Sequence, residues 1–538
     1  MELQLVGLGV DATAEDAMAR AELLVNKLLD PTEGHVPLLT GGHLLAQWFQ
    51  GLAGPHELSV SHVAQLLAYL LLPPPQQRDA PLPPPSSARL FAASSDPLVA
   101  SYRPLSFYLL TETVAAATHL ALRLLGFRMA GVTPGGAATV YEWTPRRAKS
   151  AAAAAANANT EAEPDSLPEP PLVFLHGIGL GLTPYLRLLG RLVVASRGQR
   201  AVYAVQYKHV SMRLTANIPA PHEVAADVAV FLAARGVRSV SLLAHSYGTL
   251  VASALTKLAA ASPAAPAIAR LTLVDPVCFA MFLPHLVRNT IYQQPVAPAA
   301  ASVRVLSAPP QAALPKSPPP LSASRNVTVA CQDNSAAEPC WGLSVEPSNE
   351  GAQPTEAQAL AVSASVPPAE VVTSHAPSDP VSGSRAAPRK GPIAAAAALR
   401  RNLVRNLLRG LVVAEFHCSV ALRRRLDWAR VNLWPSELPP DCTVVLSGRD
   451  NLVPVREVAA ILANRAAMVG PAAHHPTVLL REDLGHGGFL GDAACQQQVL
   501  AAALGCSTEE VRAALEEAEA ARRRRRRGSG RRGRRRRG

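Results

Sequence analysis

From residue 171 onward, short apolar runs alternate with stretches of helical spacing, and this alternation constrains the fold more than any other feature. The runs are Leu172 to Leu175, Ala201 to Tyr207, Ser239 to Ala244, Leu271 to Val274, Thr443 to Leu446 and Thr477 to Leu480. Strands that are apolar on both faces and separated by helices are typical of a parallel sheet with helices on both sides. The sequence therefore predicts an α/β fold with a mostly parallel sheet covered by helices.

The third run leads into a small-residue turn, Ala244-His245-Ser246-Tyr247-Gly248, and then into a helical run. A strand-to-helix turn that presents a nucleophile needs small residues two positions before and after it, because their backbones come close together. Ala244 and Gly248 meet this need, although glycine is the usual residue at the first position. We interpret Ser246 as a nucleophile. The alternative is a serine that only begins a helix.

A glycine-rich loop follows the first run, in the sequence His176-Gly177-Ile178-Gly179. The tetrahedral intermediate of acyl transfer needs two backbone N–H donors for its oxyanion. One donor is the residue after the nucleophile, and the other lies in a loop after an earlier strand. We therefore expect the amides of Ile178 and Tyr247 to form the oxyanion hole. Taken alone, the loop fits any strand-to-helix turn.

A serine hydroxyl is a weak nucleophile unless a base removes its proton, so a histidine is needed from elsewhere in the fold. His486 lies between glycines just beyond the last apolar run, and we expect it to be this base. Four other histidines are weaker candidates because they precede that run, lie in the expected lid or adjoin the serine: His474, His475, His417 and His245.

An acidic residue is then needed to accept the second N–H of the histidine and to stabilise the imidazolium. Asp450 follows the fifth run in Ser447-Gly448-Arg449-Asp450, between the serine and the histidine in the chain. We expect it to fill this role. Asp275 ends the fourth run and is the alternative acid, although an aspartate before a proline is commonly a turn former.

These motifs, in this order, resemble the α/β-hydrolase superfamily of the AB hydrolase-1 type over about 171–292 and 393–505. Two further phrases, Leu273-Val274-Asp275-Pro276-Val277-Cys278-Phe279 and Glu415-Phe416-His417, are similar to a poorly characterised eukaryotic branch of it. The resemblance implies the α/β-hydrolase fold with an inserted helical lid, and a serine esterase or lipase-like hydrolase. The resemblance predicts the fold and the residues of the catalytic triad, but it gives almost no information about the substrate.

Composition separates packed from unpacked parts, because the chain has 48 prolines and long alanine tracts. We expect a helical N-terminal region at 1–72, a Pro-rich linker at 73–97, a helix and strand before the main domain at 98–148, an Ala-rich linker at 149–170, the first part of the α/β-hydrolase core at 171–292, a disordered insertion at 293–392, a helical lid at 393–438, the second part of the core at 439–506, and a short helix with an arginine-rich tail at 507–538.

The expected lid carries eight arginines between residues 399 and 430 and only two acids, Glu415 and Asp427. The arginines are Arg400, Arg401, Arg405, Arg409, Arg423, Arg424, Arg425 and Arg430. Interleaved leucines and valines give the segment an apolar face beside the basic one. This combination predicts a lid that lies on an anionic membrane surface or covers an acyl chain with a charged head. The alternative is a solvated cap whose arginines only keep it soluble.

The net charge of +12 comes from the arginine-rich tail, because basic and acidic residues are equal in number without it. The body of the protein is therefore not predicted to bind polyanions. The tail itself could bind RNA, anionic lipid or an import receptor, or be a solvated charge run. Since no aromatic residues are interleaved with these arginines, we predict no specific nucleic-acid function.

Seven scattered cysteines, an odd number, favour free thiols and a reducing compartment. They form no cluster at metal-ligand spacing, and the sequence predicts neither a metal nor a cofactor. The N-terminus has early acidic residues and no basic region, so no secretion or transit signal is expected. Residues 104–127 are apolar, but Glu112, His119 and Arg123 interrupt them, which favours a buried or interfacial helix over a membrane span. We expect an intracellular protein, cytoplasmic or membrane-associated.

The first functional hypothesis is hydrolysis of a carboxylic ester or thioester through a serine acyl-enzyme, with a small-molecule or lipid acyl ester as substrate. If an alcohol or amine enters in place of water, the same machinery is an acyltransferase. A third hypothesis is a non-catalytic interaction protein that keeps the fold. Loss of a triad residue, or a bulky side chain blocking the serine, would indicate the third.

Overall fold

The computed structural model describes residues 14–34, 41–71, 88–145, 169–292, 410–470 and 474–535, apart from residues 51, 53, 95 and 99. The predicted disordered insertion at 293–392 lies outside the described residues. So do nearly all of the Ala-rich linker and the first part of the predicted lid.

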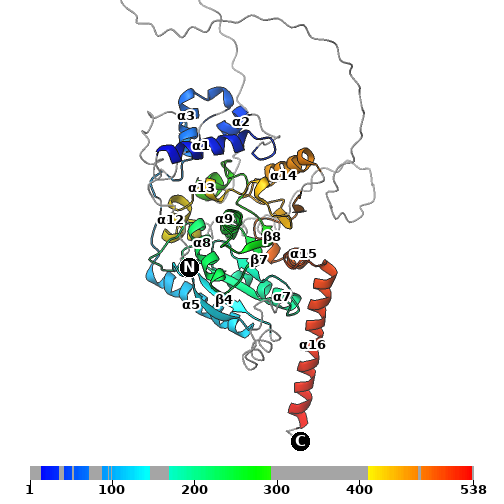
Figure 1. Ribbon diagram of the computed structural model, residues 1–538. Helices are drawn as coiled ribbons and strands as arrows, with labels where there is room; N and C mark the ends of the chain where they lie inside the picture. Colours follow the sequence, from blue (N-terminus) through cyan, green and yellow to red (C-terminus); the bar gives the residue numbers. More distant parts are fainter. Residues whose placement is uncertain are drawn as a thin grey trace, which may run out of the picture. The chain divides into compact units, whose positions relative to one another are not determined.

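The centre of the protein is an eight-stranded sheet with the strand order β10-β9-β8-β7-β5-β6-β4-β3 (Figure 1). The strands are β3 (Arg128–Val132), β4 (Thr139–Trp143), β5 (Leu172–Leu175), β6 (Val202–Gln206), β7 (Ser239–His245), β8 (Ala267–Val274), β9 (Cys442–Ser447) and β10 (Thr477–Arg481). From β6 to β10 all neighbours pair in parallel, and β4 is antiparallel to both β3 and β6. All six predicted runs are confirmed as strands of this sheet.

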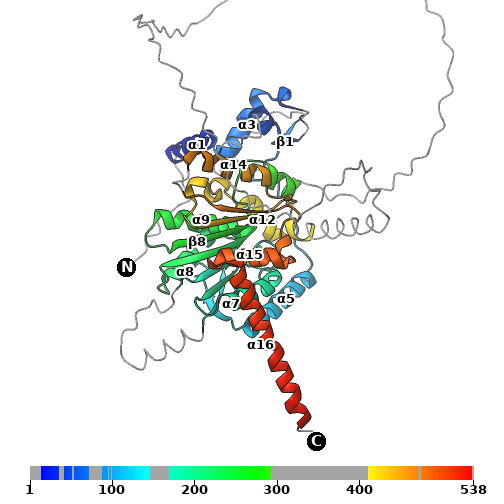
Figure 2. The same cartoon turned by 90° about the vertical axis from the view of Figure 1, so that its right-hand side faces the viewer.

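Helices cover both faces of the sheet (Figure 2). The buried side chains of the strands alternate between the two faces. The helices of the sheet are α5 (Leu105–Leu124), α7 (Leu186–Ala195), α8 (Pro221–Ala233), α9 (Tyr247–Ala261), α14 (Val455–Val469) and α15 (Ala493–Leu504). In β5, Val173 and Leu175 pack with α8, α9 and α14, whereas Leu172 and Phe174 pack with α5, α7 and α15. With the serine-bearing turn between β7 and α9, this arrangement is the α/β-hydrolase fold. The predicted fold class is confirmed.

The sheet begins earlier in the chain than the sequence indicated. The predicted strand at 138–143 is β4, and β3 precedes it with a register shift between Met129 and Gly131. Because both strands pair within the main sheet, the core starts before the Ala-rich linker and not at residue 171. The irregular β3, with Arg128 at its start and a glycine inside it, has no apolar alternation that would predict a strand.

The N-terminal region contains three helices among its described residues and packs on residues of the second half of the chain. It contains α1 (Ala14–Leu29), α2 (Gly41–Ala46), α3 (Val60–Leu71) and a small antiparallel pair, β1 (Phe49–Gln50) with β2 (Arg89–Leu90). Arg20 forms two hydrogen bonds of 2.6 Å with the carboxylate of Asp427, and the indole N–H of Trp48 donates to the carbonyl of Phe282 at 3.1 Å. The region is therefore part of the same compact unit as the sheet.

Residues 410–437 form a cap with α12 (Phe416–Arg424) and α13 (Trp428–Val431). Its arginines do not form the free basic face that the sequence predicted. Arg424 donates to the carbonyls of Ala93 and Ser94, Arg425 pairs with Glu223 at 2.6 Å, and Arg430 lies 3.4 Å from Asp427. Arg423 is buried. Three of these arginines therefore bond to other groups of the protein and the fourth is buried, while Arg400, Arg401, Arg405 and Arg409 lie outside the described residues.

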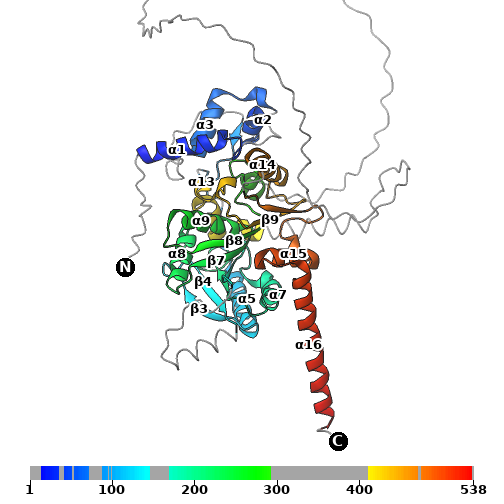
Figure 3. The same cartoon turned by 45° about the vertical axis from the view of Figure 1, so that its right-hand side comes forward.

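The last helix is longer than expected. It begins with a capping box, because Ser507 accepts from the amide of Glu510 at 3.2 Å while the Glu510 carboxylate accepts from the amide of Ser507 at 2.7 Å. The helix, α16 (Thr508–Arg535), then continues through most of the arginine-rich segment (Figure 3). Arginine is a good helix former, and Glu519 pairs with Arg523 at 2.6 Å one turn later. The predicted short helix is wrong in length for these reasons.

Candidate functional site

Backbone hydrogen bonds hold the carboxyl ends of neighbouring strands side by side. The amide of Ser246, after β7, donates to Val274 at 3.1 Å, and the amide of Asp275, after β8, donates to Val445 at 2.9 Å. The amide of Gly448, after β9, donates to Arg481 of β10 at 2.8 Å. The carboxyl ends of β7, β8, β9 and β10 therefore lie together at one edge of the sheet. This edge is the usual place of binding sites in parallel α/β folds.

The turn at Ser246 is strained in the way a presented nucleophile requires. Ser246 has φ of 51° and ψ of −123°, outside the regions that L residues usually occupy. Any Cβ at Gly248 would lie 2.3 Å from the carbonyl oxygen of Leu175, so only glycine fits where the turn crosses β5. Ala244 is fully buried, which shows that one methyl group is accommodated at the other small position.

Ser246, His486 and Asp450 form a continuous chain of hydrogen bonds. Nε2 of His486 lies 2.8 Å from Oγ of Ser246, and Nδ1 lies 2.6 Å from Oδ2 of Asp450. A carboxylate can only accept, so Nδ1 carries the proton and Nε2 is left to accept from the serine. The structure thus brings the three predicted residues together in the order base-catalysed attack requires.

Asp450 is held by its own loop as well as by the histidine. Its Oδ1 accepts from the amides of Leu452 at 2.7 Å and Val453 at 3.1 Å, and its carboxylate is fully buried. These bonds orient the second oxygen toward the imidazole.

Asp275, the alternative acid, lies at the same edge but bonds to the backbone. Its Oδ2 accepts from the amide of Gly487 at 2.7 Å. Burial raises the pKa of Asp275, but the neighbouring rings of His245 and His486 outweigh that effect and keep the pKa below its usual value. Asp275 is therefore a buried anion behind the loop that carries His486.

His245 connects Asp275 to the glycine-rich loop, a link the sequence did not predict. Its Nε2 faces Asp275 at 3.6 Å, and its Nδ1 lies 2.7 Å from the hydroxyl of Tyr185. That hydroxyl accepts from the amide of Gly177 at 3.0 Å. Both Tyr185 and His245 are buried. We call this chain of groups, from Gly177 through Tyr185 and His245 to Asp275 and Gly487, the inner polar network; only the adjacency of His245 to Ser246 could have indicated it.

The two predicted oxyanion donors belong to segments that adjoin the serine. A Cβ at Gly177 would lie 3.0 Å from the Cβ of Ser246, so the loop that carries Ile178 packs directly against the nucleophile. Tyr247 is the first residue of α9, and amides in the first turn have no acceptor within the helix. The ring of Tyr247 is buried, with its hydroxyl 3.3 Å from His209.

Two further histidines, His176 and His209, are buried beside the site. Nε2 of His176 accepts from the amide of Tyr207 at 3.0 Å, which leaves Nδ1 to donate to the carbonyl of Gly177 at 2.7 Å. Burial lowers the pKa of His176 to about 4 and that of His209 to about 3. Both rings are therefore neutral near pH 7, and they pack the loops without supplying a base.

One group of side chains within the described residues lies close enough together to share a metal ion. It consists of Asp275, Asp450 and His486, whose possible ligand atoms all lie within 4.8 Å of one another. Their atoms already bond to one another and to Gly487. Such pairing is what a serine triad needs, and the donor set gives no independent indication of a metal.

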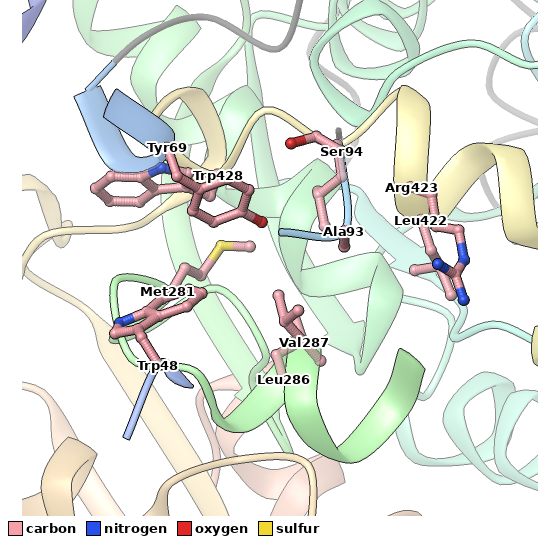
Figure 4. Close-up of a pocket in the computed structure, with 11 residues that line it drawn as sticks. Trp48, Tyr69, Ala93, Ser94, Met281, Leu286, Val287, Leu422, Arg423 and Trp428 are labelled. Atoms are coloured by element: carbon pink, nitrogen blue, oxygen red, sulfur yellow. The ribbon is translucent and has the colours of Figure 1, made fainter. Parts of the chain in front are cut away.

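A cavity of about 40 Å³ lies between the N-terminal region and the cap (Figure 4). Aromatic and aliphatic side chains line most of it, including Trp48, Tyr69, Met281, Leu286 and Trp428. Arg423 also lines it, and its Nε has no hydrogen-bond partner among the described residues. This volume holds a water-sized molecule and no acyl chain.

No protein-family model and no curated protein matches the sequence. Among solved structures, the chain is similar to a bacterial membrane phospholipase A with 14% identity, covering 75% of this chain and 94% of that one, at a TM-score of 0.38. It is also similar to carboxylesterase CesB from Bacillus subtilis, with 11% identity, 74% and 99% coverage and a TM-score of 0.32. The fold itself follows from the strand order and the turn at Ser246.

Proposed function

We propose that this protein is a serine hydrolase that cleaves a carboxylic ester or thioester through an acyl-enzyme. The observation that carries the proposal is the chain of hydrogen bonds from Asp450 through His486 to Ser246, at 2.6 and 2.8 Å. A buried carboxylate, an oriented imidazole and a serine in a strained turn together form a nucleophile with a base in reach.

In the proposed reaction, Oγ of Ser246 attacks the substrate carbonyl while Nε2 of His486 takes the hydroxyl proton. Asp450 stabilises the imidazolium through Nδ1. The imidazolium then gives its proton to the leaving alcohol or thiol as the carbonyl re-forms, which leaves an acyl group on the serine. Water repeats the sequence and releases the acid.

The amides of Ile178 and Tyr247 are proposed to stabilise the oxyanion of both tetrahedral intermediates. Backbone amides suit this task because they are already fixed and need no reorganisation as the charge develops. The inner polar network supports one of them, since Tyr185 bonds to Gly177 next to Ile178.

The acyltransferase alternative uses the same residues and differs only in the acceptor. Hydrolysis of an activated ester in buffer, compared with the same reaction in the presence of added alcohols, separates the two. A dominant ester-exchange product at modest alcohol concentration would assign the transferase.

The non-catalytic alternative is disfavoured by two observations. All three proposed catalytic side chains are present and joined. The ring of Tyr247, the bulky neighbour of the serine, packs with Tyr207 and His209 within the core.

Labelling with a fluorophosphonate probe tests the proposal directly. Wild-type protein is expected to label, and Ser246→Ala is not. Ser253→Ala is a matched control, because Ser253 lies in α9, the helix that follows Ser246, is buried and has no proposed role. Equal labelling of wild type and Ser246→Ala, or no labelling of folded wild type, would remove the serine-hydrolase assignment.

A further inference from the structure

Helix α5 carries its apolar residues outward. Five leucines are 59% to 81% exposed: Leu105, Leu109, Leu110, Leu120 and Leu124. We call them the leucine face. The buried residues of the same helix are more polar, namely Tyr108, Thr111 and Thr118 besides Leu122. Surface helices of water-soluble domains normally show the opposite pattern, and exposed apolar patches of this kind mark interaction sites.

Specific polar contacts hold α5 to the core. The hydroxyl of Tyr108 donates to Glu415 at 2.8 Å, and that of Thr111 donates to the carbonyl of Met212 at 2.8 Å. Glu112 accepts two hydrogen bonds from Arg213, at 2.9 and 2.5 Å. Among the described residues, α5 is the one helix that is long and apolar enough to cross a membrane. These contacts favour a helix that lies on a surface with its inner side attached to the protein.

The C-terminal end of α5 has the charge that an anionic surface requires. An open hollow of about 630 Å³ there is lined by Arg123, Arg128, Trp143 and apolar neighbours, with no acidic residue. Both arginines are exposed, and neither has an ion pair or a side-chain hydrogen bond among the described residues. Arg123 is also the only charged residue among the exposed positions of α5.

We propose that α5 docks the protein onto an anionic lipid surface. The leucine face enters the boundary between headgroups and acyl chains, and Arg123 and Arg128 bind phosphate headgroups beside it. Trp143, in the same hollow, suits the interface because its ring is apolar and its N–H is polar.

A second copy of this chain fits the same surface less well. A symmetric pair would place this face against itself, and the residues that line the hollow include no acid to pair with either arginine. Anionic lipid supplies that partner. The proposal does not depend on the proposed hydrolysis, because it uses none of the residues near Ser246.

Sedimentation with vesicles tests the leucine face. The samples are the full chain and a variant with Leu109, Leu120 and Leu124 changed to Ser, each with phosphatidylcholine vesicles with and without phosphatidylglycerol. We expect wild type to bind the anionic vesicles and the variant to lose binding about tenfold or more. A variant with Leu23, Leu29 and Val60 changed to Ser is the matched control, since these residues are equally exposed elsewhere.

Two further variants separate the sources of charge. Arg123→Gln with Arg128→Gln is expected to remove most of the preference for anionic over neutral vesicles. The arginines after Ala521 also attract anionic lipid in a salt-sensitive way, so a chain with those arginines changed to Gln is run beside it. When the leucine variant is made in the chain that lacks the tail arginines, we still expect it to bind anionic vesicles more weakly than the same chain with the leucines intact.

Three results would overturn the proposal. The leucine variant could bind as wild type does, or binding could follow the tail arginines alone. Wild type could also be a dimer without lipid that the leucine change makes monomeric, which would assign a self-association surface. Melting temperatures show whether each variant is folded, and the single change Leu124→Ser replaces the triple change if the latter unfolds.

Discussion

The carboxylate of Asp275 accepts the backbone N–H of Gly487, the residue directly after His486, at 2.7 Å. This bond ties the histidine loop to the end of β8. Through His245 and Tyr185, the same carboxylate connects to Gly177 in the loop proposed to hold the oxyanion. Two acids therefore serve one site, one bonding the imidazole and the other the backbone that carries it.

The first prediction compares these two acids. Asp450→Asn is expected to lower kcat about 10³-fold or more, because a neutral amide cannot stabilise the imidazolium. Asp275→Asn keeps the Asp450–His486 bond and is expected to lower kcat about tenfold or less. Steady-state kinetics with an activated ester measures both. The opposite ranking would make Asp275 the acid.

The second prediction concerns the centre of the inner polar network. Tyr185→Phe leaves the amide of Gly177 and Nδ1 of His245 without their shared partner, so the free energy of unfolding is expected to fall by about 1–3 kcal/mol. The shift of the glycine-rich loop is also expected to lower kcat more than it raises KM. Tyr203→Phe is a control, since its hydroxyl makes only a 3.5 Å contact with Glu142. Equal effects in both variants would argue against a network role for Tyr185.

The third prediction tests the turn at the nucleophile. Gly248→Ala would place a methyl group 2.3 Å from the carbonyl oxygen of Leu175. Because neither backbone can move without displacing β5 or α9, we expect a loss of about 3 kcal/mol or more and no labelling of Ser246. Gly410→Ala is a control, since its Cβ would meet nothing within 4 Å. A normal melting temperature for Gly248→Ala would contradict this account of the turn.

The fourth prediction concerns acid stability. Burial lowers the pKa of His176 to about 4 and of His209 to about 3, whereas an unfolded histidine has a pKa near 6.5. Between these values the unfolded chain binds more protons than the folded protein, so the free energy of unfolding falls as the pH is lowered from 6.5 toward 4. Each ring contributes up to about 1.4 kcal/mol per pH unit in this window.

Urea unfolding of wild type and His209→Phe at several pH values measures this effect. The variant lacks one of the two titrating rings, so its stability is expected to depend less steeply on pH. If both proteins show the same slope between pH 6.5 and 4, the neutral state of His209 does not limit acid stability.

The strands and the turn at Ser246 could be predicted from the sequence because their signals are local. An apolar run such as Leu172 to Leu175 is buried on both faces wherever its sheet lies, and the small residues around Ser246 reflect a turn only a few residues long. The position of His486 beyond the last strand was readable for the same reason, since parallel strands bring their carboxyl ends to one edge.

The partner of each acid was decided by tertiary structure alone. Asp275 and Asp450 both follow parallel strands, so the sequence puts both at the same edge. Only the loop after β9, in which Asp450 accepts the amides of Leu452 and Val453, directs one carboxylate to Nδ1 of His486. His245 and Tyr185, sixty residues apart, meet only because β5 and β7 are neighbours.

The direction of apolar and charged side chains was also a tertiary result. The composition of 104–127 fits a helix, but which of its faces meets the core depends on hydrogen bonds such as that of Tyr108 with Glu415, far away in the chain. The same holds for the cap arginines, since Arg424 bonds to the carbonyls of Ala93 and Ser94 and Arg425 pairs with Glu223 at the surface. Sequence periodicity shows that a helix has two faces, whereas long-range contacts decide which one is buried.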